Sequence, residues 1–171
     1  VCSSDLVITY EKSAEKAQAV ADEITALGRH GEAIQANSAD AQAIQNAVNR
    51  TVQSLGGLDI LVNNAGIARG GPLESLSLED IDALINVNIR GVVVAIQAAL
   101  PHLPEGGRII NIGSCLANRV AQPGIAVYAM TKSALNSLTR GLARDLGPRG
   151  ITVNLVHPGP TDSDKIGRAS C

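Results

Sequence analysis

A tyrosine and a lysine stand one helical turn apart, as Tyr128 and Lys132. Side chains four residues apart lie on the same face of a helix. A free phenol loses its proton only at about pH 10, so it is a poor acid or base at neutral pH. A cation within about 4–6 Å favours the phenolate, which suits carbonyl reduction or alcohol oxidation. A solvated lysine beside a half-buried tyrosine gives the same spacing, so the pair alone has low specificity.

Ser114 is the second candidate for chemistry. It follows the β-rich segment 108–112 and precedes the tyrosine in the chain. A serine hydroxyl at the end of a strand can hydrogen-bond a substrate oxygen on which negative charge develops. Ser114 and Tyr128 are therefore the expected substrate-binding residues of the site.

The elements that must position these residues alternate in type. Strands are expected at 6–10, 32–36, 58–62, 108–112 and 151–156, and helices at 14–27, 40–55, 77–100 and 126–146. The segment 58–62 is a continuous apolar run, typical of a strand buried on both faces. Strands that alternate with helices of this length predict an α/β fold, a doubly wound parallel sheet of the Rossmann type.

Ligands of such sheets bind beyond the carboxyl ends of the strands. Polar or glycine-bearing segments stand at three of these ends, at Asn63–Gly66, Gly113-Ser114 and Pro158-Gly159. We therefore expect one site along this edge of the sheet.

The order of these segments resembles the short-chain dehydrogenase/reductase family, and most of all its 3-oxoacyl-carrier-protein reductase branch. The resemblance spans nearly all of residues 7–164. It implies that Tyr128 exchanges a proton with substrate while Lys132 stabilises its phenolate. It further implies that Ser114 orients the substrate carbonyl and that Asn88 holds a water of the proton relay. Asn86 is a rival for that last role, and a purely structural role for Asn88 stays open.

The resemblance also implies where a nicotinamide cofactor binds. The family usually has an aspartate where this chain has Asn37, which weakens the assignment at the adenine. The implied cofactor-binding residues are Asn37, Ser38, Asn63, Ala65, Gly66, Tyr128, Lys132, Pro158, Gly159 and Thr161.

The end of the segment 6–10 indicates which cofactor is preferred. An aspartate there would accept hydrogen bonds from the ribose of NAD and repel a 2′-phosphate. This chain has Thr9-Tyr10, followed by Lys12 and Ser13. NADP(H) is therefore favoured over NAD(H), although Glu11 is an unfavourable charge beside a phosphate.

Both ends of the chain resemble translated sequencing-adapter DNA. We expect residues 1–6 and 166–171 to be non-native and residues 7–164 to be a partial dinucleotide-binding domain. In the family, a strand and a glycine-rich loop precede the segment 6–10, and another strand follows residue 164. The preceding strand would lie between segments 6–10 and 58–62. We expect the chain alone to be inactive, to bind NADP(H) poorly and to aggregate along its exposed strand edges.

Composition excludes several other functions. Lys and Arg number 14 against 16 Asp and Glu, a net charge of −2, which gives no basic face for nucleic acid. No uninterrupted apolar run reaches the roughly 18 residues of a membrane span. His30, His102 and His157 are too scattered for a metal site and are expected in loops or on the surface. Three cysteines give no disulfide framework, so a reducing cytoplasm is expected.

The sequence therefore predicts an NADP(H)-dependent oxidoreductase that reduces a ketone, carried on a small molecule or an acyl carrier, to a secondary alcohol. The tail from Gly147 to Asp162 also resembles cyclic-di-GMP-binding biofilm-dispersal proteins, so a nucleotide-binding module is an alternative. A sugar or polyol dehydrogenase is a third possibility. The whole protein is expected to form a dimer or homotetramer, and the identity of the substrate stays open.

Overall fold

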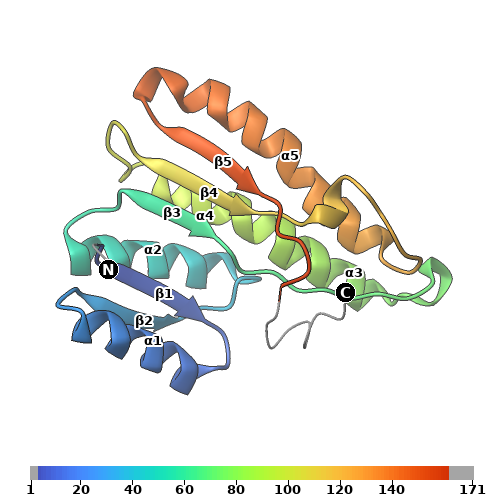
Figure 1. Cartoon of the computed structure of the whole chain (residues 1–171), viewed down its shortest axis with the longest axis horizontal. Coiled ribbons are helices and arrows are strands. Elements are labelled where there is room, and N and C mark those ends of the chain that lie inside the picture. Colours follow the sequence, from blue (N-terminus) through green and yellow to red (C-terminus); the bar gives the residue numbers. More distant parts are fainter. Residues whose placement is uncertain (1–3, 162–171) are drawn as a thin grey trace.

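The computed structural model describes residues 4–161, which form a parallel α/β structure (Figure 1). Its strands are β1 (Leu6–Tyr10), β2 (Gly31–Gln35), β3 (Ile60–Asn63), β4 (Arg108–Ile112) and β5 (Thr152–Val156). Its α-helices are α1 (Ala14–Ala26), α2 (Ala41–Leu55), α3 (Leu78–Ile85), α4 (Gly91–Ala99) and α5 (Ala126–Leu146). The expected strands at 6–10 and 108–112 and the expected helix at 126–146 have the predicted bounds.

The strands form two parallel sheets. β1 pairs with β2, and β4 pairs with both β3 and β5. Helix α1 packs on β1 and β2, α4 packs on β3 and α2, and α5 packs on β5. This is the predicted doubly wound arrangement, divided between β1 and β3.

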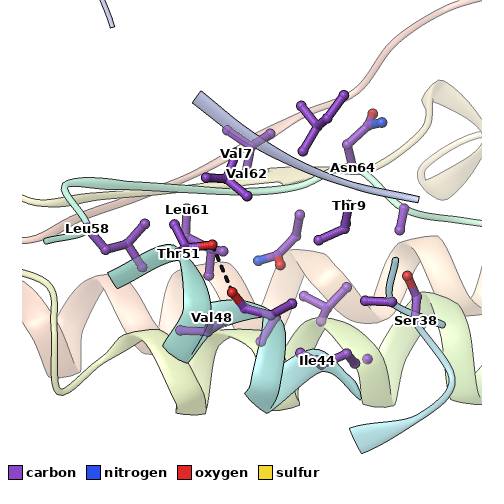
Figure 2. Close-up of a pocket in the computed structure, with 18 of the residues that line it drawn as sticks. Val7, Thr9, Ser38, Ile44, Val48, Thr51, Leu58, Leu61, Val62 and Asn64 are labelled. Atoms are coloured by element: carbon purple, nitrogen blue, oxygen red, sulfur yellow. Dashed lines mark hydrogen bonds between the residues drawn. The ribbon is translucent and has the colours of Figure 1, made fainter. Parts of the chain in front are cut away.

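A groove of about 480 Å³ lies between β1 and β3. Within residues 4–161 no ladder joins these two strands, which face each other across the gap (Figures 1 and 2). The prediction that the segment 58–62 is buried on both faces was wrong, because Ile60 is 42% exposed and Val62 51% exposed. The gap itself is where the sequence places the family's preceding strand.

Side-chain caps begin two of the helices. The Asp40 side chain accepts hydrogen bonds from the backbone N–H groups of Gln42 and Ala43 at the start of α2. Ser77 accepts one from Asp80 N–H at the start of α3. These caps satisfy N–H groups that have no partner within their helix.

The expected helix over 77–100 is interrupted in its middle. A π-helical turn, Asn86–Arg90, separates α3 from α4. At the junction, a Cβ on Gly91 would collide with the backbone carbonyl oxygen of Ser38. π-helical turns inside α-helices are frequent at functional sites.

By length and composition alone, the stretch Leu78–Ala99 could cross a membrane. Its buried residues Val92, Ile96 and Ala99 belong to the main hydrophobic cluster, together with Ile109 and Leu135. These three residues of α4 pack into the folded core.

The N-terminal segment that the adapter resemblance covers reaches into the fold. Leu6 pairs with Gly31 as the first residue of β1, and Asp5 Oδ1 accepts a hydrogen bond of 2.8 Å from His30 N–H. The origin of residues 1–6 and 166–171 stays a prediction, and the latter lie outside the described residues.

Candidate active site

Helix α5 carries Tyr128 and Lys132 one turn apart, as the sequence predicts. Lys132 is only 4% exposed, and its Nζ donates a hydrogen bond of 2.9 Å to the carbonyl of Ile112, the last residue of β4. Burying an ammonium group is costly unless it is hydrogen-bonded. The cation is thus held at the carboxyl end of β4, two residues before Ser114.

Asn88 is fully buried in the π-helical turn and joins three parts of the chain. Its Oδ1 accepts a hydrogen bond from Ile67 N–H at 2.9 Å, and its Nδ2 donates to Ile67 C=O at 2.9 Å. The same Nδ2 donates to the Thr131 hydroxyl at 3.0 Å, and that hydroxyl donates to Tyr128 C=O at 2.7 Å. Asn88 therefore has the structural role that the sequence left open, and it also touches the Tyr128 turn of α5.

Gly66 brings two of the predicted residues together. A Cβ built on it would lie 3.1 Å from Lys132 Nζ and 3.3 Å from Asn88 Oδ1. The loop after β3 therefore passes tightly against both polar groups. Gly66, Asn88 and Lys132 therefore form one cluster.

Ser114 is buried at the carboxyl end of β4. Its hydroxyl accepts a hydrogen bond of 3.1 Å from Leu116 N–H and caps the short 3₁₀-helix η3 (Cys115–Ala117), which packs on α5. Its own N–H donates to His157 Nδ1 at 3.1 Å. The serine is thus held from both sides.

The sequence assigned no role in the site to two residues of this region, Thr131 and His157. Thr131 is fully buried between Asn88 and Tyr128, and nothing in its spacing marks it. His157 lies in the loop after β5, as expected, but it is half-buried and its ring accepts a hydrogen bond from Ser114 N–H, a contact that the sequence did not predict. Its position directly before Pro158-Gly159 was the available signal.

The predicted cofactor residues Ser38, Asn63 and Ala65 line the groove between β1 and β3. Figure 2 shows Thr9, Ser38 and Asn64 gathered toward one end of it, where the strands reach their carboxyl ends. Asn63 is buried, and its Nδ2 donates to Asn111 Oδ1 at 2.9 Å, so its amide is tied to β4.

Asn37 lies apart from this lining. It is exposed, and its Oδ1 accepts a hydrogen bond of 2.8 Å from Ala39 N–H in a local turn. The structure therefore adds nothing to its weak assignment at the adenine.

The segment after β5 lies beside Ser114. Pro158 C=O accepts a hydrogen bond of 3.0 Å from Cys115 N–H, and the Thr161 hydroxyl donates to Gly159 C=O at 3.1 Å. Gly159 and Thr161 are exposed, so their backbone groups are accessible to a ligand. Three strand ends thus converge on the edge where Ser114 lies.

The loop after β1 carries the residues that favour NADP(H). Lys12 Nζ lies 3.6 Å from Glu11 Oε1, and both side chains are exposed. The cation is therefore available to a phosphate but competes with its neighbouring carboxylate. Across residues 4–161 no cluster of three or more His, Cys, Asp or Glu side chains could hold a metal ion.

The residues present fit a nicotinamide dinucleotide. Ser38 and Ala65 stand just past the carboxyl ends of β2 and β3, beyond the part of the gap assigned to the family's preceding strand, and at Gly66 the backbone approaches Lys132 closely. Ser38 and Ala65 would line the side of the ligand, and Lys132 and Tyr128 would stand at its reactive end. This is the position that doubly wound sheets give to dinucleotides.

Relatives of known sequence match most of this chain. It is 43% identical over 162 residues to the 3-oxoacyl-(acyl-carrier-protein) reductase FabG of Staphylococcus aureus, covering 94% of this chain and 65% of that protein. It is 45% identical over 156 residues to the cyclic-di-GMP-binding biofilm dispersal mediator protein of Escherichia coli, covering 91% and 62% respectively. The chain therefore spans less than two thirds of the length of these relatives.

A solved structure has a higher sequence identity to this chain than these two relatives have. A short chain dehydrogenase from Burkholderia cenocepacia in complex with NADP superposes with a TM-score of 0.95 at 62% sequence identity, over 97% of this chain and 68% of that one. The protein-family model described as short chain dehydrogenase matches residues 3–169 of this chain. The chain belongs to the short-chain dehydrogenase/reductase family, and its two parallel sheets are the Rossmann-like fold of that family.

Proposed function

We propose that the intact protein containing this chain reduces a ketone of the 3-oxoacyl type to a secondary alcohol with NADPH. The observation that carries the proposal is the buried Lys132 ammonium, fixed at the end of β4 against Gly66 and one helical turn from Tyr128. A cation in that place favours a phenolate on the same helix face. A protein that only binds nucleotides has no need of such a pair.

The proposed roles follow from the chemistry of each side chain. When bound, the reduced nicotinamide supplies the hydride that reaches the carbonyl carbon. Tyr128 donates its phenolic proton to the carbonyl oxygen, so the C=O π bond breaks and the alcohol O–H forms. Lys132 stabilises the phenolate left on Tyr128, which recovers its proton from solvent. The Ser114 hydroxyl donates a hydrogen bond to the same oxygen and stabilises its developing charge.

The cofactor preference for NADP(H) rests on two observations. The end of β1 has Thr9-Tyr10 where an NAD-binding fold would place an acid, and the exposed Lys12 and Ser13 follow closely. The Burkholderia cenocepacia relative is described in complex with NADP. A KM for NADH clearly below that for NADPH would contradict this part of the proposal.

The similarity to the Escherichia coli cyclic-di-GMP-binding protein supports a second candidate, a nucleotide-binding module. A cyclic dinucleotide is also a phosphate-bearing ligand, so the same strand ends could receive it. The intact set Asn88, Ser114, Tyr128 and Lys132 favours the enzyme.

Cytoplasmic location and assembly into a dimer or homotetramer belong to the proposal for the whole protein. An exposed free thiol on Cys115 is consistent with a reducing compartment. The proposed substrate is a small-molecule or acyl-carrier-bound carbonyl compound, with no role for nucleic acid or membrane. A net charge of −2 supports the exclusion of nucleic acid.

The experiment that tests the proposal uses the intact protein and follows the consumption or formation of NADPH. The 3-oxoacyl thioester is assayed with NADPH, and a set of sugars and polyols is assayed with NADP⁺. A reaction without substrate is the blank. Titration with cyclic-di-GMP runs in parallel. Turnover of the thioester supports the reductase, turnover of sugars alone replaces it by a dehydrogenase, and cyclic-di-GMP binding without any turnover overturns it.

A further inference from the structure

His157 makes a contact that catalysis by Asn88, Ser114, Tyr128 and Lys132 leaves unexplained. Three successive backbone N–H groups, from Gly113 to Cys115, donate to the segment Val156–Pro158. Gly113 N–H donates to Val156 C=O at 2.7 Å, and Cys115 N–H donates to Pro158 C=O at 3.0 Å. The middle donor, Ser114 N–H, is accepted at 3.1 Å by the imidazole Nδ1 of His157.

The far side of the ring is fixed as well. His157 Nε2 lies 3.0 Å from Asn136 Oδ1, and Asn136 Nδ2 donates to Asn118 Oδ1 at 3.2 Å. A backbone N–H can only donate, so Nδ1 must carry a lone pair and Nε2 the proton. His157 is therefore the neutral Nε2–H tautomer, donating to Asn136.

The ring also lies flush against the strand end. A Cβ on Gly113 would come within 2.6 Å of His157 Nδ1 and 2.8 Å of its Cε1. Only a glycine at position 113 admits the ring at this depth. Gly113 and the Asn136 hydrogen bond together leave the imidazole one position, with Nδ1 aimed at Ser114.

We propose that His157 is a positioning residue for Ser114. This inference rests on the proposed function, in which the serine hydroxyl addresses the substrate oxygen. His157 holds the Ser114 backbone from one side, while the hydroxyl accepts from Leu116 N–H on the other. Loss of the imidazole acceptor leaves the N–H of a buried residue unpaired and lets the hydroxyl move from its place. A shift of about 1 Å in a catalytic group can lower turnover by about 100-fold.

The test compares three variants of the intact protein in the NADPH-oxidation assay. His157→Leu keeps bulk but removes the acceptor, and it is expected to lower kcat by about 10- to 100-fold while KM for NADPH changes less than about threefold. In His157→Gln a carbonyl oxygen can accept from Ser114 N–H and an amide can donate to Asn136, so kcat is expected to recover to within about fivefold of wild type. His102→Leu, a half-buried histidine after α4, is the matched control and keeps wild-type kcat.

Wild-type kcat in His157→Leu overturns the proposal, and so does a His157→Gln variant as slow as His157→Leu with both folded by circular dichroism. A second measurement does not depend on activity or on variant folding. Long-range ¹H–¹⁵N correlation of the wild-type histidine rings at neutral pH is expected to give the neutral Nε2–H pattern for His157. The Nδ1–H tautomer or an imidazolium there contradicts the proposal. A wild type that lacks turnover but has this pattern refutes the reductase function and leaves the His157–Ser114 contact standing.

Discussion

Thr131 and Asn88 form the most buried polar contact of the site, and each residue is fully enclosed. The Thr131 hydroxyl accepts from Asn88 Nδ2 and donates to the Tyr128 carbonyl. This chain of hydrogen bonds connects the π-helical turn to the first turn of α5. A buried donor that loses its partner costs about 1–3 kcal/mol.

Replacing Thr131 by valine in the intact protein is therefore expected to lower the free energy of unfolding by about 1–2 kcal/mol, since shape is kept and one hydroxyl is lost. The measurement is chemical denaturation followed by circular dichroism. Thr25→Val is the control, because the Thr25 hydroxyl donates to Ala21 C=O, four residues earlier in its own helix. Equal losses in the two variants would show that the Asn88 contact adds no stability.

Glu32 connects two elements, since it lies on β2 and its Oε1 accepts from Arg50 Nε of α2 at 2.7 Å. The Ser54 hydroxyl lowers the pKa of the Glu32 carboxyl most, partial burial opposes this, and the Arg50 guanidinium lowers the pKa further. A carboxyl whose native pKa is depressed stabilises the fold above its unfolded pKa. That contribution is lost as pH falls through the native pKa.

Glu32→Gln is accordingly expected to lower stability by about 0.2–1 kcal/mol at pH 7. The difference from wild type should shrink below about pH 4.5, the ordinary value from which the pKa is lowered, and vanish once the native carboxyl is protonated. Urea unfolding at pH 7 and at acid pH measures it, with the exposed Glu74→Gln as control. A deficit that is the same at both pH values would contradict the assigned charge effect.

Local chemistry made most elements predictable from sequence. Asp40 and Ser77 are of residue types that favour helix starts and stand at the starts of α2 and α3, and the helix expected over 126–146 is α5. The π-helical turn could not be predicted, because it depends on the contact of Asn88 with Ile67, 21 residues away, and on Gly91 against the Ser38 backbone. The contacts of His157 with Ser114 and of Thr131 with Asn88 also join residues far apart in the sequence, so residue type alone could not predict them.

At the scale of the whole molecule, the main feature is the groove between β1 and β3, which separates the two sheets. Its walls are mostly apolar, and the facing edges of both strands carry backbone groups with no ladder between them in the described part of the chain. Exposed edges of this kind pair with other chains. The 171-residue chain is therefore expected to self-associate and to bind NADPH poorly.

A charge on the open edge should oppose this association. Val62→Lys in the 171-residue chain is expected to lower the weight-average mass measured by light scattering, because an edge lysine blocks strand pairing. Val120→Lys is the matched control, since Val120 is similarly exposed but lies in a loop away from the groove. If the two variants reduce association equally, net charge and not the β3 edge is responsible.

The central claim is that Tyr128 donates the proton in carbonyl reduction. The most direct measurement is kcat of Tyr128→Phe in the intact protein, with saturating NADPH and a 3-oxoacyl thioester. Tyr10→Phe is the control, as Tyr10 is the other tyrosine of the chain. The account predicts a loss of at least about 100-fold for Tyr128→Phe, with the Kd for NADPH unchanged and kcat of Tyr10→Phe at the wild-type value. A Tyr128→Phe variant that turns over at the wild-type rate would contradict it.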